Sequence, residues 1–125
     1  MTLAEAIGLA AAGAAGTLLR AGCTTAAIRL FGPAFPWGTL AVNVAGSLAF
    51  GVIYGLCRSR TILSPAQETV ILVGLLGGFT TYSSFAFQSA EMLASGRGVA
   101  ALAYVVGTNL AGIAAVWAGL RLCGS

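Results

Sequence analysis

The stretch Gly77–Phe85, which reads GGFTTYSSF, decides the fold because it interrupts an otherwise apolar segment of the chain. Two glycines followed by two β-branched threonines weaken an α-helix where a membrane span needs it most. Inside a bilayer, backbone that leaves the helix persists only where it is buried in protein or lines a cavity. Membrane proteins use half-helices that meet at such breaks to build ion sites. We therefore expect the functional site at this break.

The composition excludes an ordinary soluble domain. Of the 125 residues, 58% are apolar and 7% are charged, and the mean hydropathy is +0.96. Soluble domains carry about 25% charged residues. The net charge of +3 comes from six scattered arginines against three glutamates. This pattern fits anchors at the membrane edges better than a surface for nucleic acid.

Charged residues and prolines divide the chain into four apolar spans. A helix needs about 20 residues to cross a bilayer, and we predict four transmembrane helices, at about residues 3–30, 37–57, 66–94 and 98–121. The break, at 77–81, falls in the third of them. The connections are short, so residues 1–125 are expected to form a single all-α domain. The N-terminus lacks the basic region of a cleavable signal, so the first span should remain in the mature chain.

The arginines are distributed almost evenly between the two ends of the predicted bundle. One end receives Arg58, Arg60 and Arg121, and the other receives Arg29 and Arg97, with Arg20 as a third if it is counted with that end. The positive-inside rule then gives almost no preferred orientation. Such a chain can insert both ways up, which permits an antiparallel homodimer, although a single fixed orientation stays open. Four helices of this length leave little room inside, so a pore is expected at or beside a subunit interface.

Small residues recur at four-residue spacing on two of the spans. Ser47, Gly51 and Gly55 share a face of the second span, and Gly74 and Gly78 share a face of the third. Such faces let helix backbones approach closely in lipid, and we interpret them as packing surfaces.

The residues that an enzyme needs are missing from the sequence. There is no histidine, no acid/base pair near mid-span and no nucleophile beside a base. The three cysteines, Cys23, Cys57 and Cys123, lack metal-ligand spacing and are interpreted as small apolar residues. We therefore predict that the protein is not an enzyme.

Neutral polar side chains form stripes at helical spacing within the spans: Thr39, Asn43 and Ser47 in the second, Thr81, Ser84 and Gln88 in the third, and Tyr104 and Thr108 in the fourth. Each stripe alone is a weak indication, because Ser and Thr can bond to their own helix. Together they offer donors that replace the hydration of a small anion. The electropositive ring edges of Tyr82 and Phe85 suit an anion too, although simple core packing is the commoner fate of such a pair.

Arg20 is the one charge well inside a span. It either snorkels to the interface or supplies a positive potential that draws anions toward a vestibule. The residues alone favour the first interpretation.

Three motifs, GAAGTLLR (Gly13–Arg20), WGTLAVNVAGS (Trp37–Ser47) and GLLGGFTTYSSF (Gly74–Phe85), resemble the bacterial fluoride channels of the CrcB/Fluc family. The length, the four spans and the balanced charge agree with this resemblance. It implies a dual-topology homodimer in the cell inner membrane, with two antiparallel pores that export fluoride passively from the cytoplasm. No nucleic acid is expected as a partner.

The resemblance also assigns residues. Asn43 is similar to the family's pore asparagine and Phe85 to its second pore phenylalanine, whereas Tyr82 stands where the family usually has the first phenylalanine. The resemblance implies a polar track that contains Thr39, Thr81, Ser84, Tyr104 and Thr108. Two further departures lie near this track: Gln88 stands where many relatives carry Glu, and Gly112 leaves a gap one turn beyond Thr108.

Two more assignments concern the break and the first span. The resemblance implies that backbone carbonyls of Gly77 and Thr80, from both subunits, hold a structural Na⁺ ion that is not transported. Freed carbonyl oxygens are suitable ligands for such a hard cation. Arg20 is similar to the family's vestibule arginine.

The main alternative is a coupled exporter of the small multidrug resistance type, which also has four helices. Those proteins place an essential glutamate within the first span. Here Glu5 lies too close to the start, and the segment Gly13–Leu19 contains no acid. A scaffold without transport is disfavoured by the polar stripes, and one half of a heteromeric pair stays open.

Overall fold

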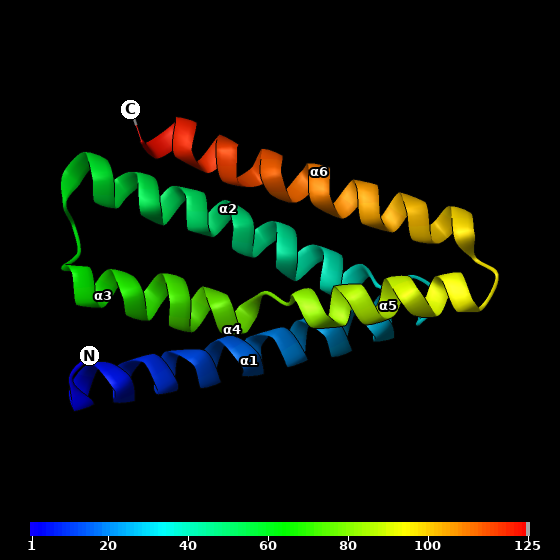
Figure 1. Cartoon of the computed structure of the whole chain (residues 1–125), viewed down its shortest axis with the longest axis horizontal. Coiled ribbons are helices and arrows are strands. Elements are labelled where there is room, and N and C mark those ends of the chain that lie inside the picture. The colour runs from blue at the N-terminus through cyan, green and yellow to red at the C-terminus, as the bar shows by residue number, and fades with distance from the viewer. Residues whose placement is uncertain (125) are drawn as a thin grey trace.

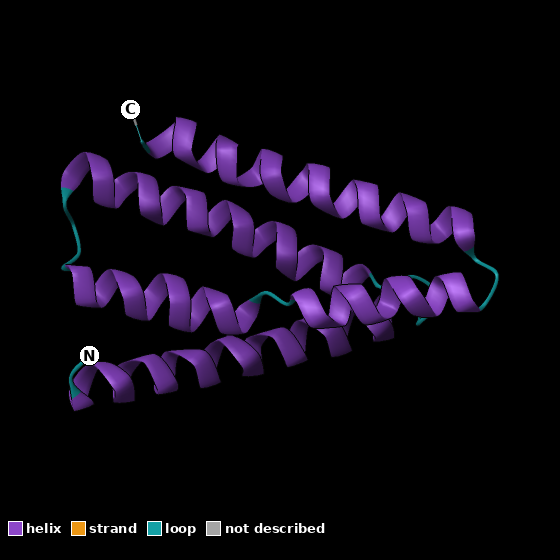
Figure 2. Ribbon diagram, in the orientation of Figure 1, coloured by secondary structure: helices purple, strands orange, loops and turns teal. Residues whose placement is uncertain are grey.

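The computed structural model describes residues 1–124, and this part of the chain is helical throughout apart from short connections, with no strand (Figures 1 and 2). The elements are α1 Leu3–Phe31, α2 Trp37–Arg60, α3 Pro65–Thr69, η1 Val70–Leu76, α4 Gly77–Phe79, α5 Tyr82–Ala94 and α6 Gly98–Cys123. The third span consists of α3, η1, α4 and α5. All four spans are long and apolar enough to cross a membrane. The prediction of four transmembrane helices is confirmed.

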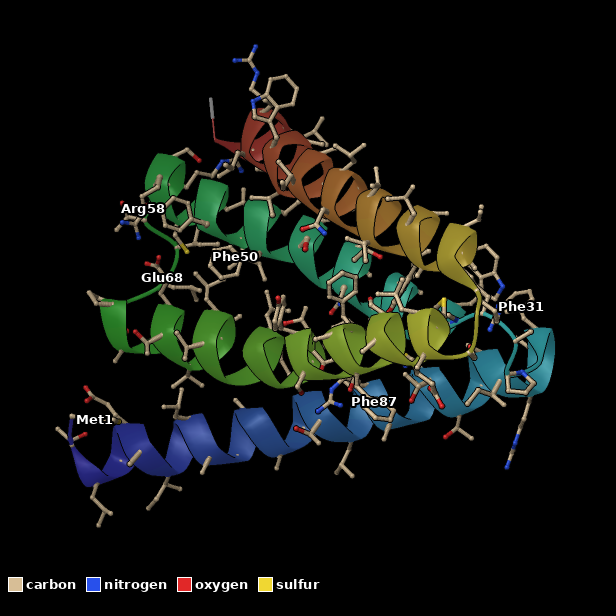
Figure 3. All side chains as sticks on the ribbon, turned by 45° about the vertical axis from the view of Figure 1, so that its right-hand side comes forward. Met1, Phe31, Phe50, Arg58, Glu68 and Phe87 are labelled. Carbon is tan, nitrogen blue, oxygen red and sulfur yellow. The ribbon has the colours of Figure 1, made fainter. Side chains whose placement is uncertain are left out.

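Local signals fix the ends of the helices. The Thr2 hydroxyl accepts the Glu5 backbone N–H, and the Glu5 carboxylate accepts the Thr2 backbone N–H, a capping box that satisfies two of the free donors at the start of α1. Ser64 and Gln67 form the same arrangement before α3. The chain turns sharply between α2 and α3, where an ion pair joins Arg58 and Glu68 (Figure 3).

The first half of the third span packs against α1 through glycine. A Cβ atom on Gly16 would collide with the Leu75 carbonyl oxygen and the Phe79 nitrogen, and one on Gly78 would lie 2.5 Å from the Gly13 carbonyl oxygen. The two backbones are therefore in direct contact, which only small residues allow. Gly78 thus packs as predicted, and Gly13 and Gly16 supply the facing surface.

The helices α2 and α6 form the second tightly packed pair. A Cβ atom on Gly119 would lie 2.6 Å from the Val52 nitrogen and 2.8 Å from the Leu48 carbonyl oxygen. On the facing helix, Gly51 lies directly against the Val116 carbonyl. After the break, α5 leaves α1 and packs on α6 instead, so the break transfers the third span from one neighbour to the other.

The third span departs from a regular helix in two ways. The segment Val70–Leu76 is a π-helix, which the sequence did not predict. The interruption itself is shorter than the predicted 77–81, because Gly77–Phe79 stay helical and only Thr80 and Thr81 become extended, with φ/ψ of −84°/160° and −150°/121°. Helical geometry persists through the glycines because the Thr80 N–H still bonds to the Leu76 carbonyl at 2.9 Å. Figure 2 shows the short connection between α4 and α5.

A glycine-to-alanine pair tests the packing of α2 on α6. Gly119→Ala places a methyl group against the α2 backbone and should lower the free energy of unfolding by about 1–3 kcal/mol. The control is Gly107, which lies on the same helix and where an added Cβ would have nothing within 4 Å. Gly107→Ala should leave stability unchanged or raise it by up to about 1 kcal/mol. The midpoint of SDS-induced unfolding measures both. Equal effects of the two substitutions would contradict the close α2–α6 contact.

Candidate functional site

Asn43 of α2 binds the break with both ends of its carboxamide. Its Nδ2 donates to the Thr81 carbonyl at 3.0 Å, and its Oδ1 accepts the Thr81 N–H at 2.8 Å. One turn along α2, Gly46 has no side chain, and the Thr80 methyl group occupies the space that a Cβ would take. The extended backbone at Thr81 is thereby satisfied from a neighbouring helix, as buried backbone requires.

Arg20 of α1 binds the other side of the break. Its Nε donates to the Gly78 carbonyl at 3.0 Å, and the contact is half-buried. In a continuous helix that carbonyl would accept the N–H of Tyr82, which instead begins α5. The structure therefore places Arg20 at the end of α4.

The two carbonyls predicted to hold sodium have lost their helical donors. The N–H of Thr81, which would bond to the Gly77 carbonyl in a helix, donates to Asn43. The N–H of Ser84, which would bond to the Thr80 carbonyl, donates to the Thr81 hydroxyl at 3.2 Å. Both oxygens are thus available to another electropositive partner, and this donor set fits a hard cation.

A chain of hydrogen bonds connects three of the four spans. The Tyr104 hydroxyl donates to Gln88 Oε1 at 2.8 Å, and Gln88 Nε2 donates to the Thr39 hydroxyl at 3.0 Å. Thr39 and Tyr104 are almost fully buried. Gln88 therefore joins two residues of the predicted track, Thr39 and Tyr104. In the sequence analysis Gln88 belongs to the polar stripe of the third span and stands where many relatives carry Glu. Spacing alone could not show that both ends of its amide are bound.

The aromatic residues lie between this chain and the break. The Phe85 ring is buried, with its centroid 5.1 Å from that of Tyr104 and 5.8 Å from that of Tyr82. Tyr82 is 78% exposed, so most of its ring lies outside the packed core. Ser84 is held at the first turn of α5 by its N–H bond to Thr81. The structure thus brings Phe85 into the core and leaves Tyr82 on the outer face of the break.

Two hollows flank the buried track. The first, of about 330 Å³, lies where α5 ends and α2 begins, and its lining includes Thr39, Gln88, Glu91 and Arg97. The second, of about 510 Å³, opens on the face of α2, α6 and the break, and its lining within residues 1–124 contains no charged side chain. Its lining includes Asn43, Ser47, Thr80, Thr81, Tyr82, Phe85 and Thr108.

Thr108 lines the second hollow with an unusual hydroxyl. Its side chain is buried, and its oxygen makes no hydrogen bond within the described residues 1–124. An unpartnered buried hydroxyl costs about 1–3 kcal/mol. One turn further, Gly112 lies beside Ser47, whose hydroxyl would be 3.6 Å from an added Cβ. The gap noted on the fourth span therefore adjoins a polar side chain of the second span.

The predicted residues thus form two groups. Thr39 and Tyr104 meet through Gln88, while Asn43, Thr81, Tyr82, Phe85 and Thr108 gather at the break and the second hollow.

The fold and the site together define a multi-pass membrane protein with an interrupted span and a neutral polar track. This class includes channels and transporters of small solutes.

Comparison with known proteins agrees with this class and narrows it. The family described as CrcB-like protein, Camphor Resistance (CrcB) matches residues 7–120. The chain belongs to this family. It is 42% identical to a fluoride-specific ion channel FluC of Nitratidesulfovibrio vulgaris over 112 residues, which are 90% of each chain. It is 42% identical to a protein of the same name from Rhizobium leguminosarum, over 94% of each chain. The predicted family is confirmed.

Exchange of the Asn43 amide for a carboxylate tests the two hydrogen bonds that join Asn43 to Thr81. Asn43→Asp replaces the Nδ2 donor by an oxygen facing the Thr81 carbonyl, and should lower the free energy of unfolding by about 2 kcal/mol or more. Hydrogen exchange of the peptide 77–85 should accelerate as well. Asn109→Ala is the control, because Asn109 is exposed and its amide bonds only to the Val105 carbonyl of its own helix, and this substitution adds no charge to the span. It should change stability by less than about 0.5 kcal/mol. Unchanged hydrogen exchange of the peptide 77–85 in Asn43→Asp would show that these two hydrogen bonds do not hold the break.

Proposed function

We propose that this protein is a fluoride-selective ion channel that lets fluoride leave the cytoplasm passively across the cell inner membrane. The observation that carries the proposal is the neutral hydrogen-bonded chain Thr39–Gln88–Tyr104, whose first two members line the first hollow. The Phe85 ring, on the wall of the second hollow, packs against Tyr104. Membership of the CrcB family and the names of its relatives support fluoride as the ion. Those relatives are named as channels, which are transport proteins and not enzymes.

The chemistry of this track suits fluoride. The ion is small and strongly hydrated, so a pore has to return its hydration energy through many donors. Tyr104, Thr39, Asn43 and Thr108 supply hydroxyl and amide groups, and the Phe85 ring offers its electropositive edge. Conduction also requires that no site binds too tightly. A neutral lining meets this requirement better than a buried arginine or lysine would.

The functional unit in this proposal is an antiparallel homodimer. The second hollow is open on one side, Tyr82 on its wall is 78% exposed, and the Thr108 hydroxyl there has no hydrogen-bond partner within the described chain. A second copy would cover this face and complete a path from both subunits. The nearly balanced arginines support insertion in both orientations, and two inverted copies would give two pores.

A structural sodium ion belongs to the same proposal. The Gly77 and Thr80 carbonyls, freed by the diverted N–H groups of Thr81 and Ser84, would hold it together with the same atoms of the second copy. The cation would neutralise the carbonyl ends of the two α4 helices, one from each copy, and would tie the subunits together. It would not be transported.

A coupled exporter of the small multidrug resistance type receives no support from the structure. Glu5 is half-buried, and its carboxylate is engaged in the capping box of α1. Glu68 pairs with Arg58 near the start of the third span. Glu91 lies at the first hollow, toward the end of α5. None of the three carboxylates lies near the middle of a span.

Efflux from liposomes tests the channel directly. Purified protein in vesicles loaded with fluoride and chloride should release fluoride rapidly, as measured with a fluoride electrode, and retain chloride. Phe85→Ile should lower the fluoride flux tenfold or more, because it removes the ring edge from the path. Phe87→Ile is the control and should leave the flux unchanged, because Phe87 is an exposed phenylalanine of the same helix that lines neither hollow. Equal release of both anions would refute fluoride selectivity.

Replacement of sodium tests the structural ion. When Na⁺ is exchanged for N-methylglucamine on both sides of the membrane, the proposal predicts a loss of flux and a lower dimer stability, because a large organic cation cannot fit between carbonyl oxygens. Native mass spectrometry of the dimer should show a bound sodium. Full flux and a stable dimer in sodium-free buffer would exclude this ion without excluding the channel.

A further inference from the structure

The carbonyl at the end of α4 receives its hydrogen bond from another helix. In a continuous helix the Gly78 oxygen would accept from the N–H of Tyr82, but the backbone turns away at Thr80 and Thr81. Arg20 Nε takes the place of that donor at 3.0 Å. A carbonyl left without a donor in this position would cost about 1–3 kcal/mol.

The sequence of α1 makes this contact possible. Gly13 and Gly16 bring the α1 backbone into contact with Leu75, Gly78 and Phe79. Arg20 follows Gly16 by four residues, so it lies one helical turn further along the same face. The motif GAAGTLLR therefore combines a surface for close approach with one side chain that reaches the break.

Arg20 is not in the position of a vestibule charge in this protomer. It lines neither of the two hollows that flank the track. Its Nε also binds a backbone carbonyl and not a carboxylate. The helical stretch 65–79 ends in a row of partly negative carbonyl groups, and a guanidinium donor gives a stronger, charge-assisted hydrogen bond there.

We propose that Arg20 is a positioning residue for the break, and that the property it supplies is the N–H donor at Nε. By holding the Gly78 carbonyl, Arg20 fixes the direction in which α4 ends. The neighbouring carbonyls of Gly77 and Thr80 then remain free for a cation, and Thr81 remains within reach of Asn43. This inference rests on the proposed channel function for its flux readout only.

Three substitutions separate the donor from the charge. In Arg20→Gln, Nε2 is bonded to Cδ as Nε is in arginine, so a donor stays at the same place while the charge is lost. In Arg20→Lys the charge stays, but a methylene group occupies the position of the donor. Arg20→Met removes both. Arg29→Gln, at an exposed position near the end of α1, is the control for a general loss of positive charge.

Two measurements read out these variants. The first is fluoride efflux, for which Arg20→Gln should stay within threefold of the unmodified protein and Arg20→Lys and Arg20→Met should fall tenfold or more. The second is hydrogen exchange of the peptide 77–85, which needs no transport. Its protection should be kept in Arg20→Gln and lost in the other two variants. Arg29→Gln should leave both readouts unchanged.

If Arg20 acted as a vestibule charge, the order of the efflux rates would be reversed, with Arg20→Lys active and Arg20→Gln impaired. That result would overturn the proposal. Equal behaviour of Gln and Met at this position would overturn it as well, whether both variants conduct or both fail. If the unmodified protein releases no fluoride, the channel function fails. Hydrogen exchange still decides the role of Arg20 in that case.

Discussion

The structure depends on one requirement, which is that every polar backbone group inside the membrane has a partner within the protein. Water is absent from the hydrocarbon core, and each unsatisfied N–H or C=O group there costs several kcal/mol. The extended residues Thr80 and Thr81 violate helical bonding at the centre of the third span. Their neighbours therefore have to supply the missing donors and acceptors. Asn43 does so from α2 and Arg20 from α1.

These contacts determine where the functional side chains lie. Once Thr81 is held by Asn43, its hydroxyl accepts the Ser84 N–H and begins α5. The start of α5 sets the rotation of the helix, so that Phe85 turns into the core and Gln88 reaches Thr39 and Tyr104. A change of helix register at the break would move Gln88 by about 100° for each residue. The polar track is thus a consequence of how the break is closed.

Sequence reasoning reached the four spans because it relied on charge-free length and on prolines, which act locally. It also placed the interruption near Thr80, since consecutive threonines after glycines disfavour a helix. It extended the break over Gly77–Phe79, which stay helical because α1 packs closely on them. The π-helix at Val70–Leu76, and the hydrogen bonds of Arg20 and Gln88, were not predicted. The hydrogen bonds of Arg20 and Gln88 join segments that are distant in the sequence, which one sequence without structure does not reveal. Nothing in the structure explains the π-helix.

The same requirement applies to two polar groups beside the break that lack a hydrogen-bond partner within the described residues 1–124. Tyr82 is 78% exposed beside the break, and the Thr108 hydroxyl is buried without a partner on the wall of the same hollow. Lipid tails offer neither group a hydrogen bond, whereas a second copy or a hydrated ion path offers both. Larger transporters meet this need within one chain through inverted repeats. For a chain of 125 residues with balanced arginines, we infer that an inverted second copy supplies what the single bundle lacks.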